Sequence, residues 1–487
     1  MPLMDIKHIV DDERVHWALF LVITGLSAYP DIRSSLQCGK YYKPWKQTTP
    51  IVIVSTKKDI AEFSEAGCLS QRAVYADMFG FKHTMNKYEH NTNAYRVIRT
   101  RLFSRVLQVN GPNHLSALYP RLLAQLDSSL AKELHNGRAL NGWTLNADTL
   151  EINMALTDRS EGTSLPVAQT VRRLASKLMS IMFFGENLAS DEKFSNALLR
   201  YPRDIVRCMA AFQITPSLMS PVVHMFLTNR GEAMRLIQGR LFEYMGPGRS
   251  NWDEPDLTKR LTIMHNMTEL ADDSDYWNPE LLSQSLLGIW FAASHQPWMN
   301  LHFIILELCA RKEWQVSLRQ ELEQHLPLDY ETLEQLPLLD SFIKETVRLN
   351  PLDTLAIRRK ALEPYTFSNG TLSVPKGATV CVSAYNLMHN PETYPGPDSF
   401  EPARFLPDNP KDQQRKFTEI SETFPVWGYG SLACPGRIHA SLVIKMVVSQ
   451  LLMKYNLRLK DENARTRWSW ETFTMPYEST QFILEQL

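Results

Sequence analysis

The sequence has few cysteines and no excess of charge of either sign. Its 487 residues include six cysteines, with no Cys-x-x-Cys pair and no close spacing typical of a zinc site or a disulfide framework. The 52 basic and 53 acidic side chains leave a formal net charge of -1, so the chain lacks the basic excess that neutralises nucleic-acid phosphates. We therefore expect a protein of a reducing compartment that does not bind nucleic acid.

A long apolar run is also missing from the sequence. Residues 15–29 come nearest to one, but they are fewer than the ~20 apolar residues of an ordinary membrane-spanning helix. The acidic residues Asp11, Asp12 and Glu13 precede this run, which argues against a secretory signal peptide because such peptides begin with basic residues. The run therefore predicts either a marginal membrane anchor or a buried helix.

The chain does contain enough apolar material for a large core. Hydrophobic residues make up 44% of it, which excludes a disordered protein. Apolar side chains recur at three- and four-residue spacing, and helix ends are marked by prolines, as expected of helices. The predicted helical stretches are 94–246, 280–312, 338–349 and 435–452. Pro297 lies inside the second of these and is expected to kink it.

A small amount of β-structure is predicted after the third of these helices. Asn369-Gly370 lies between two short extended runs, which is a strong signal for a hairpin. Six prolines between residues 391 and 410 predict an irregular loop. The expected fold class is therefore mainly α with small β-sheets, an α+β arrangement.

The most informative string is Trp427-Gly-Tyr-Gly-Ser-Leu-Ala-Cys-Pro-Gly-Arg437, a glycine-bearing loop that leads into a helix. Gly428 and Gly430 allow backbone angles closed to other residues and leave room for a flat ligand. Pro435 suits the first position of a helix. A helix N-terminus favours the thiolate form of a cysteine, which is the form that binds metal. Cys434 is therefore predicted to be an anionic metal ligand, the alternative being an inert buried thiol.

This loop resembles the haem-binding loop of the cytochrome P450 family. The family pattern of an aromatic residue, two glycines and a cysteine is matched by Trp427, Gly430, Cys434 and Gly436. The resemblance implies haem b as the cofactor, with Cys434 as the axial thiolate ligand of its iron. Leu432 stands where the family usually has an arginine or histidine for a haem propionate, so another residue would have to supply that anchor.

Two further motifs that resemble the family occur upstream in the expected order. The first is Glu345-Thr-Val-Arg348, whose charged ends lie on one face of a helix. The second is Pro402-Ala-Arg-Phe405 in the proline-rich loop. By resemblance, Arg404 completes a network with Glu345 and Arg348, in which carboxylate and guanidinium groups bond in pairs and hold the loop in place. The implied role of this network is structural.

Several arginines match positions where the family binds the haem propionates. Arg359 is the first candidate, and its neighbour Arg358 is the alternative. A solvated run of charge would explain both equally well. Arg99, with Arg96 and Arg101 beside it, lies where an early helix of the family offers further partners, and the sequence does not choose among these three.

On the distal side of the haem, the family's long central helix usually carries an acid followed by an alcohol. The matching positions here hold His295 and Gln296, followed by Pro297. Histidine can relay protons near neutral pH, while the amide of glutamine can hold water but not exchange a proton. We expect His295 and Gln296 to be catalytic by holding ordered water. The alternative for His295 is a satisfied polar group in a packed helix.

The resemblance runs from about residue 48 to the C-terminus and is closest to filamentous-fungal microsomal members. It implies the P450 fold in a single haem-thiolate catalytic domain over residues 31–487, after a possible membrane anchor and lead-in over residues 1–30. It also implies attachment to the endoplasmic reticulum membrane, with the catalytic domain facing the cytosol. The stretches implied to contact substrate are 79–83, 212–225, 291–293, 353–357 and 475–477.

The implied activity is that of a haem-thiolate monooxygenase. Its substrate would be a lipophilic small molecule of fungal secondary metabolism, such as a terpenoid, polyketide or alkaloid, because ligand pockets are mostly apolar. Oxygen would come from O₂, and NADPH-derived electrons would come from a separate diflavin reductase. Two alternatives remain open: the same fold catalysing rearrangement, dehydration or oxidative coupling without net oxygen insertion, and a haem-binding protein that has lost catalysis.

Overall fold

The structure is a computed structural model of the chain. It describes residues 51–85, 102–141, 143–145, 152–154, 162–245, 259–271, 278–370, 372–407 and 415–487. The predicted anchor over residues 1–30 and the candidate arginines Arg96, Arg99 and Arg101 lie outside the described residues.

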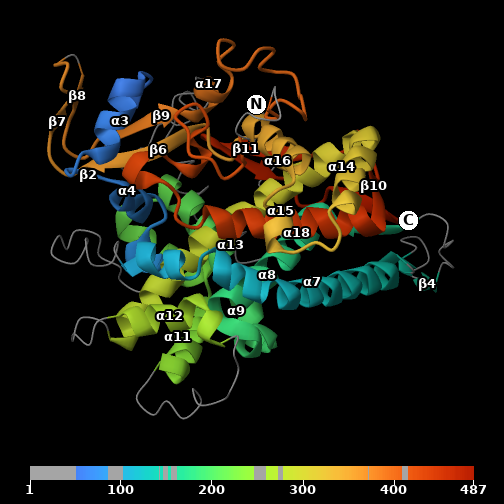
Figure 1. Cartoon of the computed structure of the whole chain (residues 1–487). Coiled ribbons are helices and arrows are strands. Elements are labelled where there is room, and N and C mark those ends of the chain that lie inside the picture. Colours follow the sequence, from blue (N-terminus) through green and yellow to red (C-terminus); the bar gives the residue numbers. More distant parts are fainter. Residues whose placement is uncertain are drawn as a thin grey trace.

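Long helices form the centre of the molecule (Figure 1). They are α7 (Pro112–Asn141), α8 (Val167–Ser190), α13 (Pro279–Ala310) and α18 (Arg437–Lys454). Helix α13 packs against both α8 and α18, and its buried side chains lie on all sides of the helix. Such a helix belongs inside a large protein, because apolar side chains all round leave no face for water.

Shorter helices surround this centre. They are α3 (Lys57–Glu65), α4 (Gln71–Met78), α5 (Phe81–Thr84), α9 (Glu192–Ile214), α10 (Ser220–Leu227), α11 (Glu232–Met245), α12 (Ile263–Leu270), α14 (Lys312–Gln324), α15 (Tyr330–Leu333), α16 (Pro337–Leu349) and α17 (Ala384–Met388). Single 3-10 turns are η3 (Ser217–Met219), η5 (Lys259–Leu261), η6 (Pro425–Trp427) and η7 (Gly430–Leu432). In Figure 1, α9, α11 and α12 lie on the side of α13 opposite to the largest sheet.

The strands form small separate sheets. The largest has the order β1-β9-β6-β2, and another has the order β10-β13-β5. Three two-stranded pairs are β11-β12, β3-β4 and β7-β8. The bounds are β1 (Ile51–Val54), β2 (Leu69–Ser70), β3 (Trp143–Leu145), β4 (Ile152–Met154), β5 (Thr163–Pro166), β6 (Leu355–Ala361), β7 (Tyr365–Thr366), β8 (Ser373–Val374), β9 (Thr379–Ser383), β10 (Tyr455–Leu459), β11 (Arg467–Trp470), β12 (Phe473–Pro476) and β13 (Gln481–Gln486).

The mainly α fold class with small sheets, predicted from the sequence, is confirmed. The helices expected over 280–312, 338–349 and 435–452 are α13, α16 and α18, each within two residues of the expected bounds. The predicted hairpin is the β7-β8 pair, and Gly370 in its turn has a φ of 70°, a value that glycine adopts without strain. The described part of the proline-rich segment, residues 391–407, contains no helix or strand.

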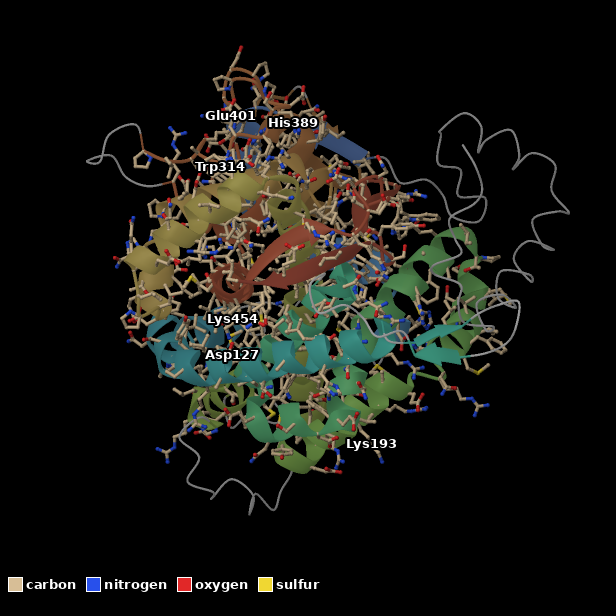
Figure 2. All side chains as sticks on the ribbon, turned by 90° about the vertical axis from the view of Figure 1, so that its right-hand side faces the viewer. Asp127, Lys193, Trp314, His389, Glu401 and Lys454 are labelled. Carbon is tan, nitrogen blue, oxygen red and sulfur yellow. The ribbon has the colours of Figure 1, made fainter. Side chains whose placement is uncertain are left out.

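Ion pairs also join helices that are far apart in the sequence. One joins Lys454, the last residue of α18, to Asp127 of α7, with Nζ and Oδ1 2.6 Å apart (Figure 2). Both side chains are more than two-fifths exposed, so this pair contributes little to stability. Among the described helices, none is both long and apolar enough to cross a membrane.

Candidate active site

The Cys434 loop is held by its own backbone and by a buried tryptophan. The Cys434 amide donates to the Trp427 carbonyl at 2.6 Å. The Trp427 indole is buried and donates from Nε1 to the Phe417 carbonyl at 2.6 Å, with the Phe417 ring 5.0 Å away edge to face. The aromatic residue of the motif therefore fixes the start of the loop, and its hydrogen bond satisfies the polar tip that a buried tryptophan carries.

Two of the loop glycines make room for neighbouring protein atoms. Gly428 has a φ of 77°, and a Cβ there would lie 2.2 Å from the Leu432 carbonyl oxygen. Gly430 has a φ of 54°, and its Cβ would lie 2.7 Å from a carboxylate oxygen of Glu65. A Cβ on Gly436, by contrast, would meet no atom within 4 Å. Open space therefore lies beside Gly436.

The surroundings of Cys434 act on the pKa of its thiol in both directions. Helix α18 begins at Arg437 with Gly436 as its N-cap, so Pro435 is not the first helical residue. Burial raises the pKa of the Cys434 thiol, although the Gly436 amide and the Arg437 charge lower it. The protein alone therefore disfavours the thiolate, and a bound metal cation would have to supply the missing stabilisation.

One face of α13 is open in the middle of an otherwise buried helix. Ala292 and Gln296, one turn apart, are exposed, although Trp290, Phe291 and Pro297 beside them are buried. Small side chains on this face leave space beside the helix, and Gln296 places an amide in it. The structure thus brings Gln296, a predicted catalytic residue, to an accessible position.

His295 has a different environment from Gln296. Its ring stacks on Phe291 with centroids 5.9 Å apart and meets the edge of Trp298 at 6.0 Å. The guanidinium carbon of Arg172 lies over the Trp298 ring, 4.0 Å from its centroid. Burial, with a smaller effect of the Arg172 charge, lowers the pKa of His295 to about 3. The imidazole is therefore neutral near pH 7 and cannot act there as a cationic acid.

A line of aromatic rings runs from near the cysteine to Phe291, on the His295 side of α13. Tyr75 of α4 lies close enough to Cys434 for the thiol to raise the pKa of its phenol, although burial is the larger cause. Tyr75 stacks on Phe79 at 6.1 Å, and Phe79 meets Phe291 of α13 edge to face at 4.8 Å. The sequence did not single out Tyr75, because no motif marks it.

The two candidate propionate-binding arginines point to different parts of the molecule. Arg359 is buried and donates to the carbonyls of Phe63, Ser64 and Leu69, so it caps the C-terminal end of α3. Arg358 donates from Nε and Nη2 to the two carboxylate oxygens of Asp353 at 2.9 and 2.8 Å. Neither is a solvated charge.

Arg358, not Arg359, faces the compartment of the cysteine. Its charge acts on Tyr75, and Tyr75 in turn feels the Cys434 thiol. Arg358 also donates to Oγ1 of Thr472 at 2.6 Å. Of the two arginines, Arg358 is therefore the one whose charge reaches Tyr75, while its guanidinium is paired with Asp353.

Glu345, Arg348 and Arg404 form one buried network. Arg348 donates from Nε and Nη2 to both carboxylate oxygens of Glu345 at 2.7 and 2.8 Å, and Arg404 adds a third bond at 3.0 Å. The guanidinium of Arg348 also binds the carbonyls of Met388 and Pro397. Removing one partner of such a pair typically costs about 3–5 kcal/mol, because a charge stays buried without compensation.

The residues present fit a large planar cofactor with an iron and acidic side groups. The partly exposed residue Cys434 supplies a ligand. Open space beside Gly436, with the aromatic wall and the exposed face of α13, supplies room for the group. Among the described residues, no group of three or more His, Cys, Asp and Glu side chains could hold a metal by itself. A metal at Cys434 would therefore need ligands of its own, as haem iron has.

The family model named Cytochrome P450 matches residues 35–484. The chain belongs to the cytochrome P450 family. Its cofactor is therefore haem, whose iron takes a cysteine thiolate as axial ligand, and the chain is a monooxygenase with a redox partner and a small-molecule substrate. Within this P450, Cys434 is the cysteine whose loop carries the family motif.

Curated relatives of this P450 are fungal. "Cytochrome P450 monooxygenase janP" of Penicillium janthinellum is 25% identical over 445 residues, which cover 88% of this chain and 79% of the relative. "Cytochrome P450 monooxygenase ptmP" of Penicillium ochrochloron is 29% identical over 303 residues, covering 59% of this chain and 66% of the relative.

Solved structures confirm the P450 fold. A zebra fish cytochrome P450 with progesterone superimposes with a TM-score of 0.65 at 17% identity, covering 93% of this chain and 98% of the other. The retinoic acid bound cyanobacterial CYP120A1 gives a TM-score of 0.64 at 18% identity, covering 90% and 89%. At such identities the likeness concerns the fold alone.

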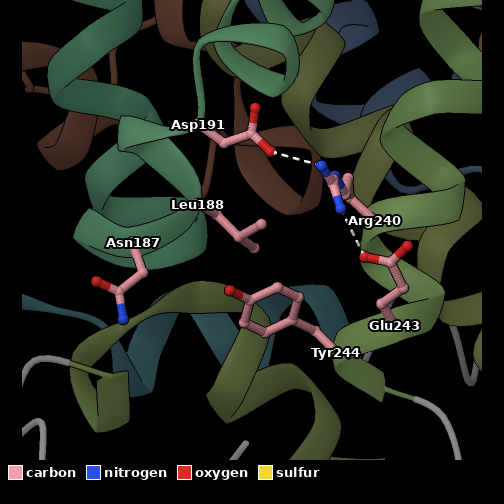
Figure 3. Close-up of a pocket in the computed structure, with 6 residues that line it drawn as sticks. All are labelled: Asn187, Leu188, Asp191, Arg240, Glu243 and Tyr244. Atoms are coloured by element: carbon pink, nitrogen blue, oxygen red, sulfur yellow. Dashed lines mark hydrogen bonds and ion pairs between the residues drawn. The ribbon is translucent and has the colours of Figure 1, made fainter.

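A separate surface pocket of about 310 Å³ lies between the end of α8 and helix α11 (Figure 3). It is lined by Asn187, Leu188, Asp191, Arg240, Glu243 and Tyr244. Arg240 bridges Asp191 at 3.1 Å and Glu243 at 2.9 Å. No predicted site residue lines this pocket, and its polar, open character is unlike the apolar pocket that a lipophilic substrate needs.

Proposed function

We propose that this P450 oxidises a lipophilic small molecule of fungal secondary metabolism. The observation that carries the proposal is the aromatic wall of Tyr75, Phe79 and Phe291, which runs from near Cys434 to the central helix α13. Phe81 extends it, with its ring 5.9 Å from that of Phe79. Such a lining favours an apolar, ring-rich guest. The Penicillium origin of the similar sequences supports a fungal metabolite.

The chain's own residues divide the remaining tasks. Haem, when bound, supplies the activation of oxygen. Cys434 holds its iron, and Arg358 is the basic group placed to meet a propionate. Gln296 holds a water through its amide on the exposed face of α13, while His295, which is neutral, offers at most an N–H for the same network.

We further propose that electrons come from NADPH through a separate diflavin reductase. The support is the absence of any evident flavin- or nicotinamide-binding segment in the sequence. This P450 therefore needs a partner to reduce it, and a diflavin reductase is the donor of the microsomal members that it resembles.

We also propose attachment to the endoplasmic reticulum membrane, with the catalytic domain facing the cytosol. The support is a patch of exposed apolar side chains on η3 and α10, made up of Leu218, Met219, Val222, Met225 and Phe226. Residues 214–228 contain no Asp, Glu, Lys or Arg. A gathering of apolar side chains without charge suits the boundary between headgroups and acyl chains.

The proposed function is tested first on the cofactor. In the carbon monoxide difference spectrum of the reduced protein, we expect the red-shifted Soret band of thiolate ligation, and Cys434→Ala should abolish it. Cys68→Ala, which removes another partly exposed free cysteine, is the control and should leave the band unchanged. A spectrum indifferent to Cys434 would overturn the assignment. With the band present, NADPH use stimulated by a lipophilic substrate in the presence of a diflavin reductase tests the activity.

A further inference from the structure

The C-terminal end of α9 is joined to the β11–β12 hairpin by a single side chain. Gln213, the penultimate residue of α9, accepts from the Trp470 indole Nε1 at 3.2 Å through its Oε1. Its Nε2 donates to a carboxylate oxygen of Glu471 at 3.3 Å. Both atoms of one amide are thus used to connect segments that are far apart in the sequence.

The hairpin is in turn connected to the cysteine compartment. Thr472, next to Glu471, accepts from Arg358 at its Oγ1 and from the Thr354 amide at its carbonyl. Strand β12 also packs against α13. The hairpin therefore lies between the end of α9, the central helix and the arginine that faces Cys434.

The connection is suited to opening and closing. Gln213, Trp470 and Glu471 are all partly exposed, and hydrogen bonds that water can replace contribute little net stability. Glu471 has a φ of 51° in the turn of the hairpin, a strained value for a residue other than glycine. Gln213 bonds to Glu471 and to its neighbour Trp470, so it is the side chain of α9 that ties down this turn.

We propose that Gln213 is a positioning residue that latches α9 to the β11–β12 hairpin and controls how fast a lipophilic ligand enters and leaves the site. The inference rests on the proposed function, because it concerns access to that same site. Release of the latch separates α9 from the hairpin without changing the groups that contact the bound ligand. Both rates of exchange then change together, and the equilibrium affinity stays nearly constant.

A charge exchange at the latch tests this proposal. Gln213→Ala removes both bonds of the latch, and Gln213→Glu keeps an acceptor for Trp470 but places two carboxylates together, so both variants open it. The double variant Gln213→Glu with Glu471→Gln restores an amide-carboxylate pair in the reverse direction. Gln125→Glu is the matched control, because the Gln125 amide bonds only to Ser129 within its own helix.

The measurement is stopped-flow absorbance of the holoenzyme with clotrimazole, a bulky lipophilic imidazole that ligates haem iron. We expect both Gln213→Ala and Gln213→Glu to accelerate association and dissociation, each on the order of threefold to tenfold, the equivalent of one hydrogen bond. The double variant should return to wild-type rates, and Gln125→Glu should not differ from wild type.

Two results would overturn the latch while leaving the proposed function intact. One is unchanged rates in both single variants of a protein with a normal carbon monoxide spectrum. The other is a change in the equilibrium affinity alone, which indicates a disturbed site and not a gate. A wild-type protein that lacks the thiolate spectrum overturns the proposed function instead, so the two failures are distinguishable.

Discussion

Arg358 and Arg359 are neighbours in the sequence but serve different parts of the molecule. Adjacent residues of a strand point to opposite faces, and the register of β6 shifts between Ala356 and Arg359. Ile357 lies in this irregularity with a φ of 53°. The result is that Arg358 meets Asp353 near the cysteine compartment and Arg359 caps α3. A motif match alone could not distinguish these two directions.

At the same scale, Gly428 is the residue of the cysteine loop that we expect to tolerate substitution least. In Gly428→Ala the new Cβ meets the Leu432 carbonyl at 2.2 Å in a backbone conformation unfavourable for alanine. The loop must shift, at a cost of at least about 2 kcal/mol. We expect the haem content per protein, measured as pyridine haemochromogen, to fall well below that of the wild type.

Gly239→Ala is the control for this prediction. Gly239 lies inside α11, and a Cβ there meets nothing within 4 Å. Alanine is favoured over glycine in a helix by about 0.5–1 kcal/mol, so this variant should be slightly more stable and keep its haem. Equal haem content in the two variants would contradict the role given to Gly428.

At the scale of the element, α13 separates two predicted catalytic residues by one position. A helix turns by roughly 100° per residue, which leaves Gln296 on the exposed face and His295 between Phe291 and Trp298. The sequence assigned both to one water network. The packing of α13 gives the accessible position to Gln296 and makes His295 part of an aromatic stack.

We expect this difference to appear in the coupling of NADPH use to substrate oxidation. Gln296→Ala removes the amide from the exposed face, so a larger share of the NADPH consumed should be recovered as hydrogen peroxide, by roughly twofold or more for the loss of one hydrogen-bonding group. The measurement is peroxide released per NADPH consumed in the reductase-supported assay. Unchanged coupling would contradict the role of Gln296.

His295→Asn tests the complementary expectation for the same helix. The pKa of His295 is lowered to about 3, so its ring is neutral above that pH and does not titrate between pH 5 and 8. The pH profile of NADPH use should therefore keep its shape over this range in the variant. Disappearance of a limb near pH 6.5, the usual range for histidine, would show that His295 titrates in the working enzyme.

At the scale of the whole molecule, the apolar patch on η3 and α10 bears on how the protein meets a membrane. We expect deletion of residues 1–30 to weaken binding to phosphatidylcholine vesicles without abolishing it. In the truncated protein, the further substitutions Leu218→Ser and Phe226→Ser should lower the remaining vesicle affinity by about tenfold or more, because each apolar side chain is worth about 1.5–3 kcal/mol when fully buried. Vesicle flotation measures both steps.

The matched control uses exposed apolar residues of another region. Val316 and Leu326 are 50% and 55% exposed, and Val316→Ser with Leu326→Ser should leave vesicle binding unchanged. Full binding after deletion of residues 1–30 would count against an anchor there. An equal loss from the control pair would count against a specific membrane-facing patch.

Helix positions and the cysteine motif could be read from the sequence because both depend on local order. Apolar periodicity and the prolines at helix ends determine α13, α16 and α18 to within two residues, and Asn369-Gly370 determines the β7-β8 turn. The spacing of Trp427, Gly430, Cys434 and Gly436 identifies the haem loop, because a loop that holds the same cofactor needs the same length.

Contacts between distant segments were decided only by the tertiary structure. The sequence proposed the partners of Glu345 through a family motif, but it gave no sign that Tyr75 approaches Cys434 or that Gln213 joins α9 to the β11–β12 hairpin. The balance of effects on the Cys434 thiol also depends on packing, because burial raises its pKa while the Gly436 amide and the Arg437 charge lower it. Burial and side-chain direction depend on packing of the whole chain, and local sequence does not contain them.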